Sequence, residues 1–94
     1  MRLKWVHVVN YDYNAKRYDR KAEYWVLDDL DGVVPVAYVH PQEDGVHDAD
    51  VMDRQAFSMR SDIRGVLTYI AELILIDYPN ASYVDGVDER VPTP

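Results

Sequence analysis

The chain has 94 residues, of which 48% are hydrophobic, and it carries 17 acidic and 10 basic side chains for a formal net charge of −7. This composition excludes a chain that is disordered throughout, and the length leaves room for one domain, which we take to span residues 1–94. Cysteine is absent, which excludes disulfide bonds, thiolate metal sites and cysteine nucleophiles.

Three strands are predicted in the first half of the chain. Residues 2–10 alternate in a way that places apolar side chains on both faces of a strand. Residues 22–27 and 33–39 are rich in the β-branched and aromatic side chains that favour strands. Pro35 has no N–H group to donate, so the third strand should lie at a sheet edge or contain a bulge.

The segments between these strands are predicted to be turns and loops. Residues 11–21 are polar and are interpreted as a long hairpin connection. Residues 28–32 should form a turn in which Gly32 supplies a positive φ. Residues 40–50 contain proline and glycine together with many charged side chains, which is typical of a loop.

A helix over residues 62–77 is the most regular pattern in the sequence. Its apolar side chains recur at steps of three and four, and Leu75 and Ile76 widen this stripe, so the last turn should be deeply packed. Ser61 is the expected N-cap, and Pro79 should stop the helix. The stripe consists of Ile63, Val66, Leu67, Ile70, Leu73 and Ile74.

The remaining segments are less regular. Residues 51–60 fit both strand and helix spacing, and we favour a short helix or an irregular segment. Tyr83 and Val84 could add a short strand, and residues 88–94 are expected to be an exposed tail. The predicted fold class is therefore α+β, with a small antiparallel sheet of three to four strands and one long C-terminal helix packed on one face.

No segment has the pattern of a signal peptide or a membrane span. The first residues contain charges and only a brief apolar run, and Arg64 and Glu72 interrupt the predicted helix. A membrane-spanning helix needs about 20 predominantly apolar residues. We therefore expect a cytoplasmic protein that makes no use of a membrane.

The uneven distribution of charge is the main indication of function. Residues 28–53 carry eight acidic side chains and no Lys or Arg, which favours a basic protein partner. Tyr11, Tyr13 and Tyr18 are candidate interface aromatics, because tyrosine offers apolar area with a polar end. The acidic candidates are Asp28, Asp29, Asp31, Glu43, Asp44, Asp48, Asp50 and Asp53.

These features together predict a small, acidic, non-enzymatic binding protein. Its general character is that of phage-encoded inhibitors, some of which display carboxylates where the phosphates of a nucleic acid would lie. The expected partner is a basic, nucleic-acid-binding protein surface. The sequence indicates no cofactor and no particular oligomeric state.

A divalent-metal site is the first alternative. Residues 40–53 combine two imidazoles with several carboxylates, and nitrogen and oxygen donors of this kind can hold a divalent cation. The candidate ligands are His40, His47, Asp48 and Asp50. Their spacing matches neither a zinc-protease helix nor an EF-hand loop, and a solvated acidic loop explains the same residues.

Weak nucleic-acid binding is the second alternative, and catalysis is not expected. Residues 16–21 place four basic side chains near tyrosines, a combination that can contact phosphates and stack on bases. The acidic remainder of the chain would repel a polyanion, so nucleic acid is an improbable partner. There is no glycine-rich phosphate loop and no nucleophile motif, and His7 is interpreted as a packed histidine rather than a base.

Overall fold

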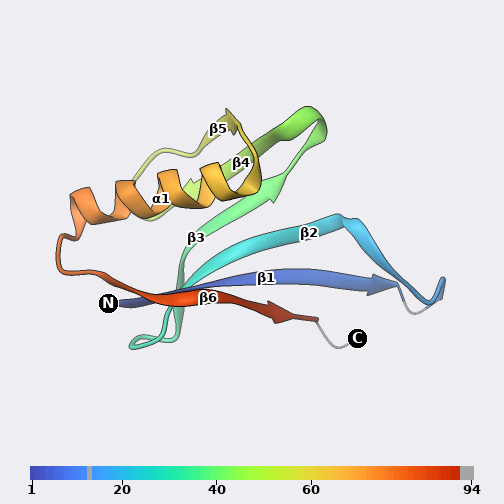
Figure 1. Cartoon of the computed structure of the whole chain (residues 1–94), viewed down its shortest axis with the longest axis horizontal. Coiled ribbons are helices and arrows are strands. Elements are labelled where there is room, and N and C mark those ends of the chain that lie inside the picture. The colour runs from blue at the N-terminus through green and yellow to red at the C-terminus, as the bar shows by residue number, and fades with distance from the viewer. Residues whose placement is uncertain (13, 92–94) are drawn as a thin grey trace.

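In the part of the chain that the structure describes, one mixed β-sheet carries a single α-helix on one face (Figure 1). The computed structural model describes residues 1–12 and 14–91, and of residues 11, 12 and 18–22 it describes the backbone only. Within these residues the elements are β1 (Arg2–Asp12), β2 (Arg17–Asp29), β3 (Val34–Pro41), a 3-10 turn η1 (Glu43–Gly45), β4 (Val46–Val51), β5 (Phe57–Arg60), α1 (Ile63–Asp77) and β6 (Ser82–Arg90).

The predicted fold class is wrong in its sheet and in the position of its helix. The sheet has six strands in the order β5-β4-β3-β2-β1-β6, and it is mixed because β6 runs parallel to β1 while the other pairs are antiparallel. The helix is a short element of 15 residues, and a strand follows it. Helix α1 therefore carries the chain from the β5 edge of the sheet to the opposite edge.

Strand β4 takes up residues 46–50 of the predicted loop over residues 40–50, and β3 extends into its first two residues. His47, Ala49 and Val51 are buried on the helix side of the sheet, whereas Asp48 and Asp50 lie on the other side. This is the alternation of a half-buried strand. The density of acidic side chains obscured it, because the outward positions of this strand are aspartates and not neutral polar residues.

Strand β5 forms in a segment predicted to be helical or irregular, and strand β6 confirms and lengthens the short strand considered at Tyr83 and Val84. Phe57 and Met59 in β5 face the core, so the strand spacing is correct for residues 57–60. Residues 52–56 are irregular, as one of the favoured alternatives had it, and the favoured short helix is wrong. Strand β6 is an edge strand in which every residue but Tyr83 is exposed, so it lacks apolar alternation. Of the predicted tail, residues 88–90 belong to β6, and 92–94 lie outside the described residues.

Helix α1 confirms the predicted stripe but not its last turn. Val66, Ile70 and Ile74 are almost fully buried, while Leu75 and Ile76 are 40% and 69% exposed. The stripe packs on a core cluster whose other members come from the strands. A separate finding is that none of the described helices has the length and apolar content that crossing a bilayer requires. The strand members of this cluster are Leu3, Trp5, Leu27, Val36, Ala37, Val39, Ala49 and Val51.

The N-terminus of α1 is capped by a different residue from the one expected. Asp62, not Ser61, is the N-cap, and its carboxylate accepts a hydrogen bond of 2.8 Å from the backbone N–H of Gly65. A Cβ atom at Gly65 would come within 2.1 Å of the Ser61 hydroxyl. Glycine at this position therefore allows the capping segment to close tightly on the first turn.

The sheet face opposite α1 carries a second, smaller apolar cluster. Val6, Val8 and Val26 are each at most 4% exposed and pack with Tyr24, although no helix in the described part of the chain covers them. We call this side of the sheet the open face. Its apolar floor is shielded by neighbouring side chains of the sheet itself.

Pro35 marks a bulge in the interior of the sheet. The β2–β3 register shifts between Leu27, which lies opposite Ala37, and Asp28, which lies opposite Pro35. Val36 is the extra residue, and the bulge turns it into the core at 6% exposure. The predicted bulge is confirmed, whereas the edge position is wrong because β3 lies between β2 and β4.

The turn between β2 and β3 places its positive φ on valine. Val33 has a φ of 53° and is 87% exposed, whereas Gly32 beside it does not have a positive φ. A β-branched side chain is unfavourable in this region of φ and ψ. The turn closes with a hydrogen bond of 2.8 Å from the Val33 N–H to the Asp29 carbonyl, which holds the valine in that conformation.

The substitution Val33→Gly is expected to raise the free energy of unfolding by about 0.5–1 kcal/mol. Relief of about 1–3 kcal/mol of backbone strain should exceed the roughly 0.5–1 kcal/mol entropic cost of glycine. Urea unfolding would measure the change. Val34→Gly serves as the control, because Val34 begins strand β3 without a positive φ and should lose stability. A less stable Val33→Gly protein would show that the valine is not strained.

Candidate functional site

Aromatic and acidic side chains from three adjacent strands meet on the open face. The register places Tyr38 opposite Asp50 and His40 opposite Asp48 in the β3–β4 pair. Tyr24 of β2 completes the group, because its ring lies against the ring of His40. We call Tyr24, Tyr38, His40, Asp48 and Asp50 the open-face patch.

The three rings of the patch form one continuous aromatic surface. The ring centroids of Tyr24 and His40 are 5.4 Å apart, and those of Tyr38 and His40 are 6.2 Å apart. Tyr24 and Tyr38 are 6.4 Å apart in a tilted arrangement. Tyr38 and His40 are exposed, so the faces of these rings are accessible to a partner.

Among the described side chains, no cation pairs with either carboxylate of the patch. Asp48 accepts a hydrogen bond of 2.5 Å from the Ser58 hydroxyl on β5. Asp50 is exposed, and among the described residues neither aspartate belongs to an ion pair. Negative charge is therefore concentrated beside the aromatic rings on an uncovered face.

A hollow of about 300 Å³ adjoins the patch on the side of the β2–β3 turn, and Arg90 of β6 also lines it. Val26 forms part of its lining, together with Tyr24 and Tyr38. An ion pair of 3.1 Å between Asp28 and Arg90 also lines it. The hollow is half apolar in character, so it suits the methylene stem of a long side chain whose charged end reaches the patch.

The groups of the patch are of kinds that attract cations. The patch offers π faces and carboxylate oxygens, and its only nitrogen donor is the imidazole of His40. No family model matches the chain, and no curated protein or solved structure is significantly similar to it. The arrangement of these residues is thus the basis for a functional assignment.

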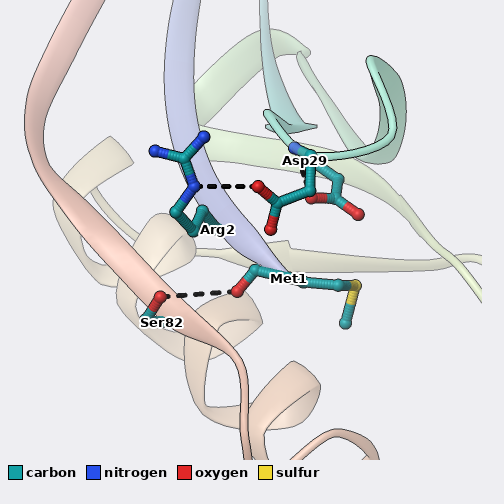
Figure 2. A network of polar contacts seen from close by, with 5 residues as sticks. Met1, Arg2, Asp29 and Ser82 are labelled. Atoms are coloured by element: carbon teal, nitrogen blue, oxygen red, sulfur yellow. Dashed lines mark hydrogen bonds and ion pairs between the residues drawn. The ribbon is translucent and has the colours of Figure 1, made fainter.

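The first three acidic candidates, Asp28, Asp29 and Asp31, make ion pairs or hydrogen bonds within the protein and are not part of the patch. Arg2 donates a hydrogen bond of 2.8 Å to Asp31, and this bond lowers the pKa of the Asp31 carboxyl. Asp29 accepts a bond of 3.1 Å from the Asp31 backbone N–H. Figure 2 shows this corner, where the Ser82 hydroxyl also donates to the Met1 carbonyl. These contacts tie the β2–β3 turn and β6 to the start of β1.

The other acidic candidates outside the patch lie in two separate turns. Glu43 and Asp44 are exposed in η1, at the end of the β3–β4 hairpin. Asp53 follows β4 and accepts a hydrogen bond from the Tyr78 hydroxyl, which raises the pKa of that tyrosine. The stretch that is continuous in sequence is therefore distributed over several parts of the molecule. Asp48 and Asp50 are the acidic candidates that the strand register places directly opposite His40 and Tyr38.

The tyrosines predicted to lie at an interface cannot be placed as side chains. Tyr13 lies outside the described residues, and only the backbones of Tyr11 and Tyr18 are described, as partners across the β1–β2 hairpin. Tyr24 and Tyr38 were not among the predicted interface residues. The sequence feature that could have identified them is their alternation with buried residues, which places each tyrosine at an outward position of its strand.

The structure does not bring the four candidate metal ligands together. His40 lies on the open face with Asp48 and Asp50, whereas His47 points to the helix side and is 8% exposed. The His47 Nδ1 atom lies 3.1 Å from the Gly45 carbonyl oxygen. Among the described side chains, no three His, Asp or Glu residues are grouped as metal ligands.

The basic hairpin is described only in part. Lys16 and Arg17 are exposed at the tip of the β1–β2 hairpin, which extends beyond the N-terminal end of α1 (Figure 1). The side chains of residues 18–21 lie outside the description. Binding of nucleic acid by this hairpin therefore stays a prediction.

Proposed function

We propose that the protein is a non-enzymatic binding protein whose open-face patch engages a basic protein surface. The observation that carries the proposal is the placement of Asp48 and Asp50 beside three associated aromatic rings on an uncovered sheet face. Arginine and lysine are the side chains that both halves of this arrangement attract. The partner is thus defined by its exposed cations.

Each component of the patch favours arginine in a different way. A guanidinium over an aromatic face gains about 0.5–1 kcal/mol at an exposed site. The same group can donate two parallel hydrogen bonds to a carboxylate. The net charge of −7 adds a long-range attraction that accelerates encounter with a basic partner at low salt.

A surface that normally binds nucleic acid is the form of partner that this chemistry suits best. Two positions on one strand face are separated by about 6.6 Å, so Asp48 and Asp50 present a short row of negative charge. The neighbouring rings resemble bases in offering flat faces for stacking. A phage-type inhibitor that occupies such a surface is the specific role that we propose.

Replacing Asp48 and Asp50 with asparagine is expected to weaken binding to a nona-arginine peptide about three- to tenfold. The double variant removes two carboxylates beside the rings, each contributing about 0.2–1 kcal/mol. Fluorescence anisotropy of a labelled peptide at two salt concentrations would measure affinity and its salt dependence.

The matched control is Glu72→Gln/Asp85→Asn, which changes the net charge equally at exposed sites on α1 and β6. This control should lower the affinity by less than twofold. A second measurement, amide chemical-shift mapping, should place the largest peptide-induced changes on β2, β3 and β4. Equal losses in the two double variants would show that only net charge attracts the peptide and would contradict the proposal.

A further inference from the structure

A cleft lies on the helix side of the sheet, opposite the open-face patch. Its volume is about 570 Å³, and it separates the N-terminal half of α1 from β1 and β6. Trp5, His7 and Trp25 line it from the sheet, Leu67 from the helix and Glu89 from β6. The cleft uses none of the residues on which the proposed function rests.

The aromatic lining of the cleft is held in place by its own contacts. The rings of His7 and Trp25 are parallel within 7° and their centroids are 4.1 Å apart. His7 Nε2 lies 3.0 Å from a Glu23 carboxylate oxygen, and its Nδ1 lies 3.8 Å from one of Glu89. The Glu23 side chain is 23% exposed and that of Glu89 is 76% exposed. Glu89 therefore remains accessible to a ligand, while Glu23 orients the histidine.

We propose that this cleft binds a small organic ammonium ion with an apolar body. The volume lies within the range of about 300–1,000 Å³ found for small-molecule sites. Indole faces attract cations as well as apolar groups, and the exposed carboxylate of Glu89 gives the ammonium a hydrogen-bond acceptor. Leu67 and Ala71 on the helix and Val87 on β6 offer apolar contact to the body.

Arg64 on the helix side of the cleft bears on where the ammonium would lie. Its side chain lines the cleft from the first turn of α1 and carries a positive charge. Repulsion from Arg64 directs a cationic ligand toward Glu89 on the β6 side. An anionic ligand would take the opposite orientation. Removing the charge of Arg64 or of Glu89 should therefore change the affinities of a cationic and an anionic ligand in opposite directions.

Intrinsic fluorescence tests the proposal directly, because both tryptophans of the chain line the cleft. Phenethylamine is the probe, and 3-phenylpropionate and phenethyl alcohol are its anionic and neutral analogues. Phenethylamine should produce a saturable change with a Kd on the order of 1 mM or below. Phenethyl alcohol should bind about three- to tenfold more weakly, because it lacks the charge that Glu89 attracts, and 3-phenylpropionate at least about tenfold more weakly, because Glu89 also repels it.

Three substitutions that retain the fold complete the experiment. Glu89→Gln should weaken phenethylamine about three- to tenfold, and Arg64→Gln should strengthen it. Asp85→Asn, on the same strand but outside the cleft, should leave the Kd unchanged. The proposal is overturned if 3-phenylpropionate binds as tightly as the amine. It is also overturned if no ligand gives a saturable change, or if Asp85→Asn is as damaging as Glu89→Gln.

Discussion

Replacing Ile70 with alanine should lower the free energy of unfolding by about 2–5 kcal/mol. Ile70 is fully buried at the centre of the α1 stripe, so its loss removes apolar contacts and leaves a cavity against the strands. A change of this size is a large fraction of the roughly 5–15 kcal/mol that stabilises a typical domain. Urea or thermal unfolding followed by circular dichroism would measure it.

The control for this substitution lies on the same helix. Ile76 has the same side chain but is 69% exposed, so Ile76→Ala should change stability by less than about 0.5 kcal/mol. The comparison holds the chemistry constant and varies only burial. Similar losses from Ile70→Ala and Ile76→Ala would mean that the helix is rotated from the orientation described.

The second large effect concerns Tyr83 and alkaline pH. Burial raises the pKa of the Tyr83 hydroxyl from 10.0 to about 12, and this hydroxyl donates a hydrogen bond of 3.1 Å to the Ala71 carbonyl. Between pH 10 and 12 the unfolded chain releases this proton while the folded chain retains it, so stability falls as the pH rises through this window.

The expected loss from Tyr83 is about 1–2 kcal/mol between pH 10 and 12. A full shift of two pH units would correspond to about 2.7 kcal/mol, and screening by solvent at the partly exposed ring reduces it. The Tyr83→Phe variant isolates this contribution from the titration of lysines and other tyrosines. It should be less stable than the wild type below pH 10, and the difference should shrink by pH 12. A constant difference across this range would contradict the assigned burial of the hydroxyl.

The elements that sequence reasoning predicted correctly are those with a dominant apolar period. Helix α1 and the centres of β1, β2 and β3 carry such patterns, and the structure places strands or a helix there. Strand β4 was not predicted, and β6 was predicted only as a possible short strand at Tyr83 and Val84. The reasons differ. In β4 the outward positions are acidic, so the segment resembles a loop in sequence. Strand β6 lies at the edge of the sheet and has few apolar residues, so its sequence shows no clear alternation.

The candidate site was predictable only in part because it depends on strand register. Asp48 and Asp50 were predicted from charge alone. Their association with Tyr24 and Tyr38 requires β2, β3 and β4 to be adjacent and in one particular alignment. A shift of one residue would send each of these side chains to the other face of the sheet. No pattern within a single segment of sequence contains that information.

The parallel pairing of β1 and β6 has a consequence for the order in which the chain folds. Strands β1 to β5 are linked by sequential antiparallel pairings, whereas β6 must return to β1 from the far end of the sequence. Closing such a long loop is slow compared with forming hairpins, so β6 should dock late. Until it does, the edge of β1 is open to any extended chain nearby.

Once docked, β6 becomes the outer edge of the sheet and exposes Asp85, Asp88 and Glu89. Two copies that met along this edge would bring like charges together, which opposes edge-to-edge pairing. Strand β6 thus protects β1 against unwanted strand pairing in two ways. It pairs with the free backbone groups of β1, and it presents an acidic outer edge that repels the same edge of a second copy.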